Sequence, residues 1–405
     1  MKIILVTTIT PYKENYHGTS GIQYHLIVER PEDVDIEVYS FNHNDLPEEK
    51  IAEVERELGV KIHVMEKKRW IPWVHKYNLF FVRVLLRYPI FNYVSLTKAY
   101  VEEIKGKNPD GIWIYGQDTS RITRQFNGFK RVHTLPDCES LYYHRMMEQK
   151  FVKSNRLLYL RQAIMFPKYV RMERNYPTSE DIHYTLVGEK DVEFLRNNNK
   201  NIDARFIKHP HYELYGGDGQ LPMTDNVKKF NERKIRLLIA GQNNLYMNES
   251  AEKLVEALVS KGQQLKGGYS FTFLGKGWEL MVEQLRGVGY EVEHIRFAPD
   301  YIEEIKKHDV QITPITIGTG TKGKVLDALA NGLLVIGTYY AMENIAVNNG
   351  ESCIEYHEPQ EVIDVLYEIL NDRETYEQMA KKGQRQVLTE HDRNKVSAQM
   401  FDLFR

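Results

Sequence analysis

The sequence predicts an α/β protein with two domains, each built on a parallel β-sheet. Short apolar, β-rich segments alternate along the chain with segments whose apolar residues recur every 3.6 positions, which is the pattern of parallel strands joined by helices. The 405 residues exceed what one ordinary hydrophobic core holds. Thirteen strands are expected, and these are too many for one open twisted sheet. We therefore expect two Rossmann-like domains.

The expected strands of the first half are residues 3–8, 36–41, 61–65, 111–116, 131–135, 182–187 and 204–209. Those of the second half are residues 235–240, 270–275, 291–297, 310–315, 333–338 and 352–356. Helical periodicity between them is clearest over 48–58, 251–258 and 301–307. Sheets of this kind bind ligands at the carboxyl ends of their strands, so two sheets facing each other predict a central cleft between the domains.

A domain boundary is expected at YGGDGQLP, residues 215–222, which is rich in glycine and polar residues and is followed by a charged stretch up to Lys234. Such composition is typical of linkers. We therefore expect an N-terminal domain over 1–215 and a C-terminal domain over 223–390.

The composition is that of a soluble globular protein, with 42% hydrophobic and 27% charged residues. A net charge of −2 provides no global field that would draw the chain to nucleic acid. The two cysteines, Cys138 and Cys353, are too few for a disulfide scaffold or a cysteine zinc site and suit a reducing cytosol. The N-terminal MKIILVTTIT is typical of a first strand rather than a signal peptide, and no run of about 18 apolar residues predicts a membrane span.

The segment GTGTKGKVLDALANG, residues 318–332, contains two overlapping phosphate-binding motifs. GxxxxGK is most of a Walker A loop, but that loop needs Ser or Thr after its Lys to hold Mg²⁺, and Val325 stands there. GxGxxG is the dinucleotide fingerprint, but it needs an acid at the end of the next strand, where Thr338 and Tyr339 stand. The sequence therefore disfavours both an NTPase and a dehydrogenase.

What the two motifs share is the start of a helix that binds anions. A helix is expected from Lys322 to Gly332, a natural C′ glycine. The free amides and the dipole of a helix start attract anions, and Lys322 and Lys324 add positive charge. Asp327 lies one turn beyond Lys324, where its carboxylate can accept hydrogen bonds from a ribose diol. This arrangement predicts a site for a nucleotide diphosphate; the alternative is two lysines solvated at a surface helix start.

Residues 318–338, GTGTKGKVLDALANGLLVIGT, resemble the C-terminal signature of GT-B glycosyltransferases of the group 1, family 4 kind. Other segments resemble the same family in the right order along the chain. They are GTSGIQYHLI, YTLVGEKDVEFLRNN with ARFIKHP, IRLLIAGQNNLYMNESAEKLVEAL, YSFTFLGKGW and VEHIRFAPDYIEEIKKHDVQITPI. The resemblance spans nearly the whole chain, and it implies that residues 391–405 form a helix that returns to the N-terminal domain.

The resemblance implies that this turn is the donor site. Lys322 and Lys324 would take the family's basic positions at the donor diphosphate, and Asp327 would take the second acid of its "Glu, seven residues, Glu" pair. Thr319 stands where the first acid belongs, and Gln242 stands where many relatives carry Arg or Lys. Amides of the turn would then replace the missing side-chain contact to the donor sugar. The expected donor-binding residues are Gly318, Thr319, Gly320, Thr321, Lys322, Lys324, Asp327, Gly241, Gln242 and Gly275.

Asp137 stands just after the expected strand 131–135, at its carboxyl end. There it could contact sugar hydroxyls or act as a base. The alternative is that Asp137 or Ser140 caps a helix that begins at Leu141.

Gly18, Ser20 and Gly21 precede the expected helix 22–29 and could meet the donor phosphate or the acceptor. The alternative is a tight turn that needs a positive φ at glycine.

Five further polar residues are interpreted from their positions. His133 lies inside a strand and is expected to be a core histidine, while His144 and Arg145 lie on a helix and are expected to be solvated. His209 and His211 share one face of an extended segment at the domain exit, and we expect them to line the cleft without a metal.

Residues 67–89, KKRWIPWVHKYNLFFVRVLLRYP, are basic, aromatic and amphipathic. This pattern suits contact with an anionic membrane surface, which would be useful for a lipid-linked acceptor. It suits equally a helix that packs on the sheet with its cations outside.

These observations predict a glycosyltransferase that moves a sugar from a nucleotide-diphosphate sugar to a glycan or lipid-linked acceptor, in surface polysaccharide or glycoconjugate synthesis. The C-terminal domain would bind the donor and the N-terminal domain the acceptor, with Asp137 and Lys324 as catalytic residues. We expect neither a metal nor a cofactor, because helix-end amides and lysines can neutralise the leaving diphosphate. The resemblance favours retention at the anomeric carbon. We expect a cytoplasmic protein, peripheral on the inner face of the membrane.

Two other functions stay open. One is a sugar-nucleotide epimerase or a phosphorylase on the same architecture. The other is a non-catalytic partner subunit that binds a nucleotide sugar, which the missing acid at Thr319 keeps open.

Overall fold

The computed structural model of the chain describes residues 1–67, 70–77, 79–117, 119–212, 230 and 234–405. The expected linker 215–222 lies outside these residues. The chain divides into two compact units: unit 1 comprises Met1–Tyr212 with Arg393–Arg405, and unit 2 comprises Glu213–Asp392.

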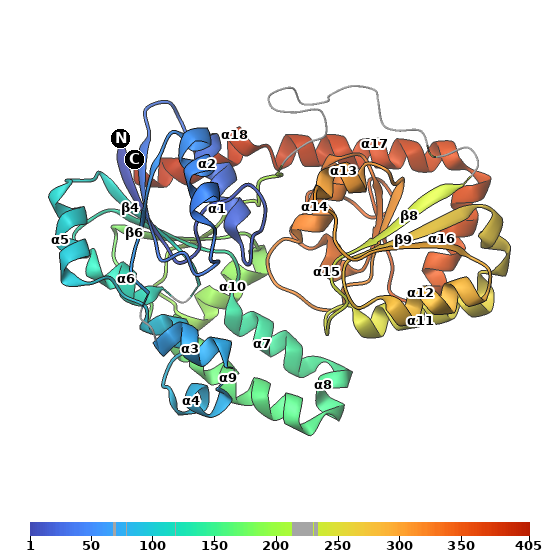
Figure 1. Ribbon diagram of the computed structural model, residues 1–405, viewed down its shortest axis with the longest axis horizontal. Helices are drawn as coiled ribbons and strands as arrows, with labels where there is room; N and C mark the ends of the chain where they lie inside the picture. The colour runs from blue at the N-terminus through green and yellow to red at the C-terminus, as the bar shows by residue number, and fades with distance from the viewer. Residues whose placement is uncertain (68–69, 78, 118, 213–229, 231–233) are drawn as a thin grey trace. The chain divides into compact units, whose positions relative to one another are not determined.

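Unit 1 contains a seven-stranded parallel sheet in the order β3-β2-β1-β4-β5-β6-β7, with helices on both faces (Figure 1). The strands are β1 Lys2–Thr7, β2 Asp35–Ser40, β3 Lys61–Val64, β4 Gly111–Tyr115, β5 Arg131–Leu135, β6 Ile182–Leu186 and β7 Ala204–Phe206. The helices are α1 Ser20–Val28, α2 Glu48–Leu58, α3 Trp70–Lys76, α4 Phe80–Leu85, α5 Lys98–Gly106, α6 Ser120–Gln125, α7 Glu139–Glu148, α8 Lys150–Ser154, α9 Arg156–Arg174, α10 Glu189–Asn198 and α18 Arg393–Phe401.

Unit 2 contains a six-stranded parallel sheet in the order β10-β9-β8-β11-β12-β13. Its strands are β8 Ile235–Ala240, β9 Tyr269–Leu274, β10 Glu291–Ile295, β11 Val310–Thr313, β12 Leu334–Gly337 and β13 Ile354–Glu355. Its helices are α11 Asn248–Lys261, α12 Glu279–Gly287, α13 Tyr301–Ile305, α14 Gly323–Ala330, α15 Tyr339–Met342, α16 Pro359–Asn371 and α17 Arg373–Glu390. The predicted fold class is confirmed, and each of the thirteen expected strands is present with its ends shifted by at most three residues.

Burial on both faces explains why central strands such as β1, β4 and β8 are apolar along most of their length. In β1, Ile3 and Leu5 pack into one core cluster, while Ile4 and Val6 pack into another on the opposite face. In unit 2 the alternate residues of β8 divide between two clusters in the same way. Successive side chains of a strand point to opposite faces, so a strand covered by helices on both sides needs apolar residues at every position.

Helix α18 belongs to unit 1, where it packs against α1. The Ser397 hydroxyl donates to the carbonyl of Leu26 at 2.8 Å, and the Arg393 guanidinium lies 3.2 Å from the Glu29 carboxylate. Met400 and Phe401 add buried side chains to the same core cluster. The end of the chain therefore completes the core that its beginning starts.

The strand order reverses once in each sheet. In unit 1 the reversal lies between β1 and β4, and in unit 2 it lies between β8 and β11. Connections from adjacent strands leave in opposite directions at such a point, which opens a crevice at the strands' carboxyl ends and makes it the usual ligand site of open α/β sheets. Each unit therefore carries one position where a ligand site is expected.

Candidate functional site

The glycine-rich turn of unit 2 joins β11 to α14, at the point where the strand order reverses. Helix α14 begins at Gly323, with Lys322 at its N-cap position and no capping hydrogen bond from that side chain. It ends at Ala330, and Gly332 beyond it has a φ of +84°, the left-handed conformation of a C′ glycine. The helix bounds agree with the sequence prediction, and the helix start faces the turn.

Lys322 folds back onto its own turn. Its ammonium donates to the carbonyl oxygens of Thr319 at 2.7 Å and of Gly320 at 3.2 Å. Gly320 has a φ of +58°, so the turn needs glycine there, whereas a Cβ atom at Gly318 would lie 2.4 Å from Cε of the flexible Lys322 side chain and would displace it. The Asn344 amide also donates to the Gly320 carbonyl at 2.9 Å. Lys322 therefore stabilises the shape of the turn.

Lys324, unlike Lys322, makes no hydrogen bond from its ammonium to the carbonyls of the turn among the residues that the structure describes. Its side chain is exposed, and its ammonium lies 5.1 Å from the ring centroid of Tyr301, within the range of a cation–π contact. The surrounding protein lowers the pKa of Lys324, and the nearby charge of Asp327 partly offsets this effect. Asp327 is buried on the next turn of α14. The helix thus places a cation at its start and an acid one turn further on.

Tyr301 was not identified from the sequence. Among the described residues its buried hydroxyl has no hydrogen-bond partner. Burial raises the pKa of Tyr301 well above its usual value, and the charge of Asp327 raises it further. The sequence carried little sign that Tyr301 contacts Lys324, because an aromatic residue at the first position of a helix, here after the N-cap Asp300 of α13, usually belongs to the hydrophobic core.

Two further loops reach the same point of unit 2. Gly241 and Gly275, just past β8 and β9, have φ values of +130° and +135°, and a Cβ atom at Gly275 would lie 2.1 Å from the Gly241 carbonyl oxygen. Gln242 is exposed beside them. The amide and hydroxyl of Thr316 donate to the Tyr246 carbonyl at 2.8 and 3.1 Å, which ties the loop after β11 to the loop after β8. The predicted donor residues therefore come from three loops at one edge of the sheet.

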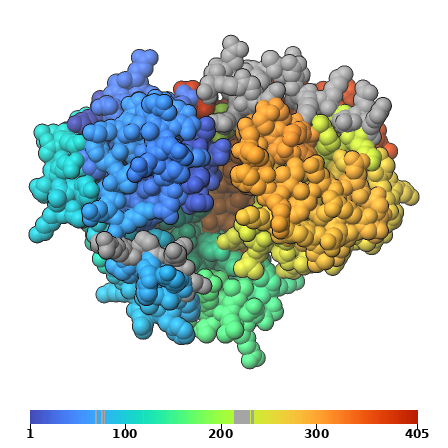
Figure 2. Space-filling model, viewed as in Figure 1, coloured from blue at the N-terminus to red at the C-terminus, as the bar shows by residue number. Residues whose placement is uncertain are grey.

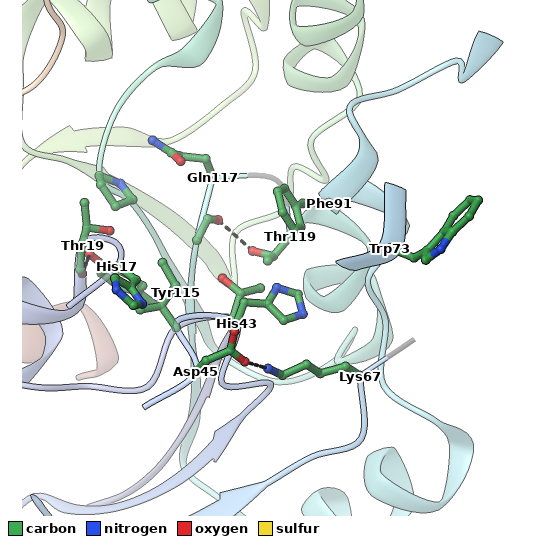
Figure 3. A pocket seen from close by; sticks show the side chains of 14 residues that line it. His17, Thr19, His43, Asp45, Lys67, Trp73, Phe91, Tyr115, Gln117 and Thr119 are labelled. Atoms are coloured by element: carbon green, nitrogen blue, oxygen red, sulfur yellow. Dashed lines mark hydrogen bonds and ion pairs between the residues drawn. The ribbon is translucent and has the colours of Figure 1, made fainter. Parts of the chain in front are cut away.

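Unit 1 has a cavity of about 520 Å³ at its own reversal point (Figure 3). The loops after β1 and β4 form much of its wall. Among the lining side chains, Trp73 of α3 lies on the side opposite His17 and Tyr115 (Figure 3). Asp45 and Lys67 form an ion pair at its edge. The lining residues are Thr8, Ile9, His17, Thr19, His43, Asp45, Lys67, Trp73, Phe91, Tyr115, Gly116, Gln117, Thr119 and Pro136.

Hydrogen bonds fix the loops around this cavity. Thr10 and Asn44 exchange two bonds, from the Thr10 amide at 2.9 Å and to its carbonyl at 3.1 Å. His17, Asn42 and Asp45 have φ values of +49°, +48° and +51°, which are uncommon for residues other than glycine. Such backbone persists where surrounding contacts over-determine it, often at binding sites. The cavity is therefore preorganised.

The predicted loop residues Gly18, Ser20 and Gly21 lie beside this cavity, between lining residues and the core. The Ser20 hydroxyl is buried and donates to the Glu14 carbonyl at 2.6 Å. A Cβ atom at Gly21 would lie 2.6 Å from the ring of Tyr212, and one at Gly18 would lie 2.7 Å from Ile9 Cδ1. Ser20 and Gly21 thus form the start of α1, while Thr19 and His17, which the sequence did not single out, line the cavity.

Asp137 follows β5 and is half-buried beside the cavity. Its Oδ2 accepts a hydrogen bond from Gln117 Nε2 at 3.3 Å, and Gln117 lines the cavity. The capping alternative is wrong, because α7 begins at Glu139 and neither Asp137 nor Ser140 is its N-cap.

Buried acids from other helices serve the start of α7 instead. Asp191 accepts from the Cys138 amide at 2.8 Å, and Glu173 accepts from the Ser140 amide at 3.0 Å and from the Ser140 hydroxyl. A carboxylate is favourable at a helix start because of the free amides and the dipole there. Burial nevertheless raises the pKa of Glu173.

Two of the histidines interpreted from the sequence, His133 and His209, are buried. His133 is fully buried between the Gly116 carbonyl, 2.7 Å away, and the hydroxyls of Thr119 and Thr123, so the prediction of a core histidine is confirmed. Burial lowers its pKa to about 4, although the hydrogen bond with Gly116 opposes the shift. His209 is buried, and its Nδ1 lies 2.7 Å from the Pro210 carbonyl.

One expectation about solvation is wrong. Arg145 is buried in α7, whereas His144 keeps 43% of its side chain exposed. Helix α7 packs against α9, and the helical pattern of the sequence alone does not show which of its residues such packing buries.

Two searches of the described residues found nothing. No helix there is both long and apolar enough to cross a bilayer. No group of three or more His, Cys, Asp or Glu side chains there is arranged to hold a metal ion.

Comparison with known proteins supports the assignment of fold and family. Residues 230–402 match the family described as glycosyl transferase-like. The HepE protein of Anabaena in complex with UDP has a TM-score of 0.63 at 12% identity, with 99% of both chains covered. Sucrose-phosphate synthase of Thermosynechococcus elongatus has a TM-score of 0.65 at 14% identity, over 100% of this chain and 98% of the other. WaaG, a glycosyltransferase of lipopolysaccharide biosynthesis, has a TM-score of 0.61 at 12% identity, over 100% and 99%. No curated protein matches the chain by sequence.

Proposed function

We propose that this chain moves a sugar from a nucleotide-diphosphate sugar to a glycan or lipid-linked acceptor, because residues 230–402 match the glycosyl transferase-like family and the chain shares the GT-B fold of its structural neighbours. The observation that carries the proposal is the start of α14, where a glycine-rich turn, a cation and a buried acid meet at the reversal point of unit 2. The complexes of HepE with UDP and with UDP-glucose support a donor of this class.

The donor diphosphate would lie against the amides of residues 318–321, with Lys324 as its counter-cation. Asp327, one turn along α14, would accept hydrogen bonds from the ribose. Amides aimed at a fixed position stabilise the charge that develops on a leaving diphosphate without reorganising, so the proposal needs no metal and no cofactor. The likeness to the family favours transfer with retention.

The acceptor would occupy the cavity of unit 1. Its wall combines aromatic rings with hydroxyl, amide and imidazole groups, which suits a sugar with one apolar face and many hydroxyls. Asp137, held beside Gln117, would be the carboxylate that contacts the reacting hydroxyl. We propose a role in surface polysaccharide or glycoconjugate synthesis, on the cytoplasmic side of a membrane.

A thermal-shift panel of UDP, GDP, ADP and CMP, with and without magnesium, tests the donor site. A nucleotide at a hundred times its Kd adds about 2.7 kcal/mol to the free energy of unfolding. Lys324→Ala should remove most of that shift, because it removes the exposed cation at the helix start. Lys261→Ala, which removes an exposed lysine at the far end of α11, is the matched control and should keep it. A full shift in the Lys324 variant would place the donor elsewhere.

The same panel, combined with an activity assay, distinguishes a transferase from a non-catalytic subunit that only binds the nucleotide sugar. Thr319 leaves the turn without the first acid of the family's pair, which is the feature that favours this alternative. Nucleotide binding with neither transfer to any acceptor nor hydrolysis of the donor would support it. Interconversion of sugar nucleotides without an acceptor would indicate an epimerase.

A further inference from the structure

Two segments of unit 1 are basic and contain no acid. Residues 67–89 hold six Lys or Arg and no Asp or Glu, and residues 149–172 also hold six Lys or Arg and no Asp or Glu. The two stretches together carry twelve Lys or Arg and no acid, whereas the whole chain has a net charge of −2 and the rest of it therefore −14. Segregation of this kind creates a local field that the net charge conceals.

The fold brings the two segments together. The buried Lys168 of α9 donates to the carbonyl oxygens of Arg83 at 2.7 Å and Val84 at 2.6 Å, and also to that of Leu86. The Arg161 guanidinium lies 5.9 Å from the ring centroid of Phe80. Carbonyls at a helix C-terminus have no partner within the helix, so Lys168 satisfies the end of α4 and attaches it to α9. The α4–α9 pair is therefore one built surface.

Large apolar side chains project outward from this surface. Phe81 and Leu85, four residues apart on one side of α4, are 85% and 86% exposed, and Leu157 of α9 is 81% exposed. Leu160 of α9 is exposed as well. Among the described residues fourteen large apolar side chains are exposed, and eight of them lie in 70–85 and 157–160. We call Phe81, Leu85, Leu157 and Leu160 the apolar face.

The surroundings of the apolar face decide which partner fits it. Exposed Lys150, Lys153, Arg156, Arg87 and Arg171 border it, and Figure 2 shows the segments around 80 and 150 as adjoining parts of the surface of unit 1. Three of the four side chains of the apolar face are leucines, which do not stack on bases, and this argues against a nucleic acid. A protein partner of ordinary composition would not explain two long stretches without one acid. Apolar side chains within a border of cations match the boundary between acyl chains and anionic headgroups.

We propose that the apolar face docks on an anionic lipid bilayer, with its leucines and phenylalanine in the headgroup boundary and the bordering cations on lipid phosphates. The surface extends the expected 67–89 contact to α9, which the sequence did not predict. Trp73 both lines the acceptor cavity and is 55% exposed beside Tyr77, with ring centroids 5.7 Å apart. If the proposed function holds, on which this last step rests, docking places the cavity next to the bilayer and the acceptor is lipid-linked.

Sedimentation with vesicles tests the docking. Wild-type protein should pellet with vesicles of phosphatidylcholine and phosphatidylglycerol at a molar ratio of roughly 3:1, and not with phosphatidylcholine alone, and salt should weaken binding. The double variant Phe81→Gln with Leu85→Gln should bind about tenfold more weakly, as should Leu157→Gln with Leu160→Gln. Each pair removes apolar area that docking would bury in the bilayer, and neither changes the charge. The matched control is Phe297→Gln with Leu280→Gln, which changes equally exposed residues of unit 2 and should bind as the wild type does.

A nucleotide thermal shift on each variant separates this proposal from the proposed function. All variants should keep the wild-type shift, which also shows that they fold. Wild-type protein that ignores anionic vesicles, or glutamine variants that bind them undiminished, would overturn docking whatever the nucleotide does. A concentration-dependent dimer that the Phe81 and Leu85 variant abolishes, without vesicle binding, would make the face an interface between two copies instead.

Discussion

The two units place their candidate sites at the same topological position but build them differently. In unit 2 the site is concentrated in ten residues, Gly318–Asp327, with two glycine turns closing it. In unit 1 the cavity draws lining residues from Thr8 to Pro136, across loops and helices that only the fold brings together. A site for a diphosphate needs only amides and a cation, which one helix start supplies, whereas a site for an acceptor must match a larger shape.

This difference separates what each site contributes. The turn of unit 2 would bind and stabilise charge, and the cavity of unit 1 would orient a hydroxyl and remove its proton. Substitutions in unit 1 should therefore alter turnover and leave nucleotide binding unchanged, and substitutions in the turn of unit 2 should weaken nucleotide binding.

The largest expected effect is on turnover. Asp137→Asn keeps the size of the side chain and removes its basicity, so transfer should slow by about 10²- to 10⁴-fold, the usual contribution of a general base. Binding of the nucleotide should be unchanged, because Asp137 belongs to the other unit. Steady-state kinetics and a nucleotide titration measure the two quantities.

Glu139→Gln, at the first position of α7, is the control for a changed acid close by and should retain turnover. Equal losses in the two variants would show that this region acts through the stability of α7 and not through a base at Asp137.

The next effect is on stability in acid. Burial holds the pKa of His133 near 4, below its ordinary 6.5, so the unfolded chain takes up a proton more readily than the folded chain. Stability is therefore complete above pH 6.5 and falls as the pH drops from 6.5 to 4, by about 3 kcal/mol. His133 bonds to Gly116 and Thr119, which line the cavity, so acid should loosen unit 1 at this point.

Urea unfolding of the wild type and His133→Asn between pH 7.5 and about 4.5 measures this effect. The variant should be less stable at neutral pH but should show a shallower dependence on pH. Identical slopes would mean that another group is responsible for the acid sensitivity.

The smallest effect concerns the donor turn. Tyr301→Leu removes the ring beneath the Lys324 ammonium and should weaken nucleotide binding by about 1 kcal/mol, the usual strength of a cation–π contact. Tyr301→Phe keeps the ring and should bind as the wild type does, as a calorimetric titration would show. Equal losses in both variants would assign the role to the buried hydroxyl instead.

The fold could be predicted because its signals are local. The central strands of the parallel sheets are nearly continuous apolar runs, and Gly332, with its positive φ, marks the end of the helix after the glycine-rich turn. The glycine-rich turn and the bounds of α14 were predictable for the same reason. Tyr301, the acids that serve α7 and the cavity walls were not, because these contacts join residues far apart in the sequence. Arg145 was expected to be solvated and is buried, because burial depends on tertiary packing that the local pattern does not contain.

The most direct test is a crystal structure with the nucleoside diphosphate that gives the largest thermal shift. The account predicts its diphosphate about 3 Å from the amides of residues 318–321 and from Lys324 Nζ, with the ribose hydroxyls on Asp327. The same nucleotide bound elsewhere, with the start of α14 empty, would contradict it.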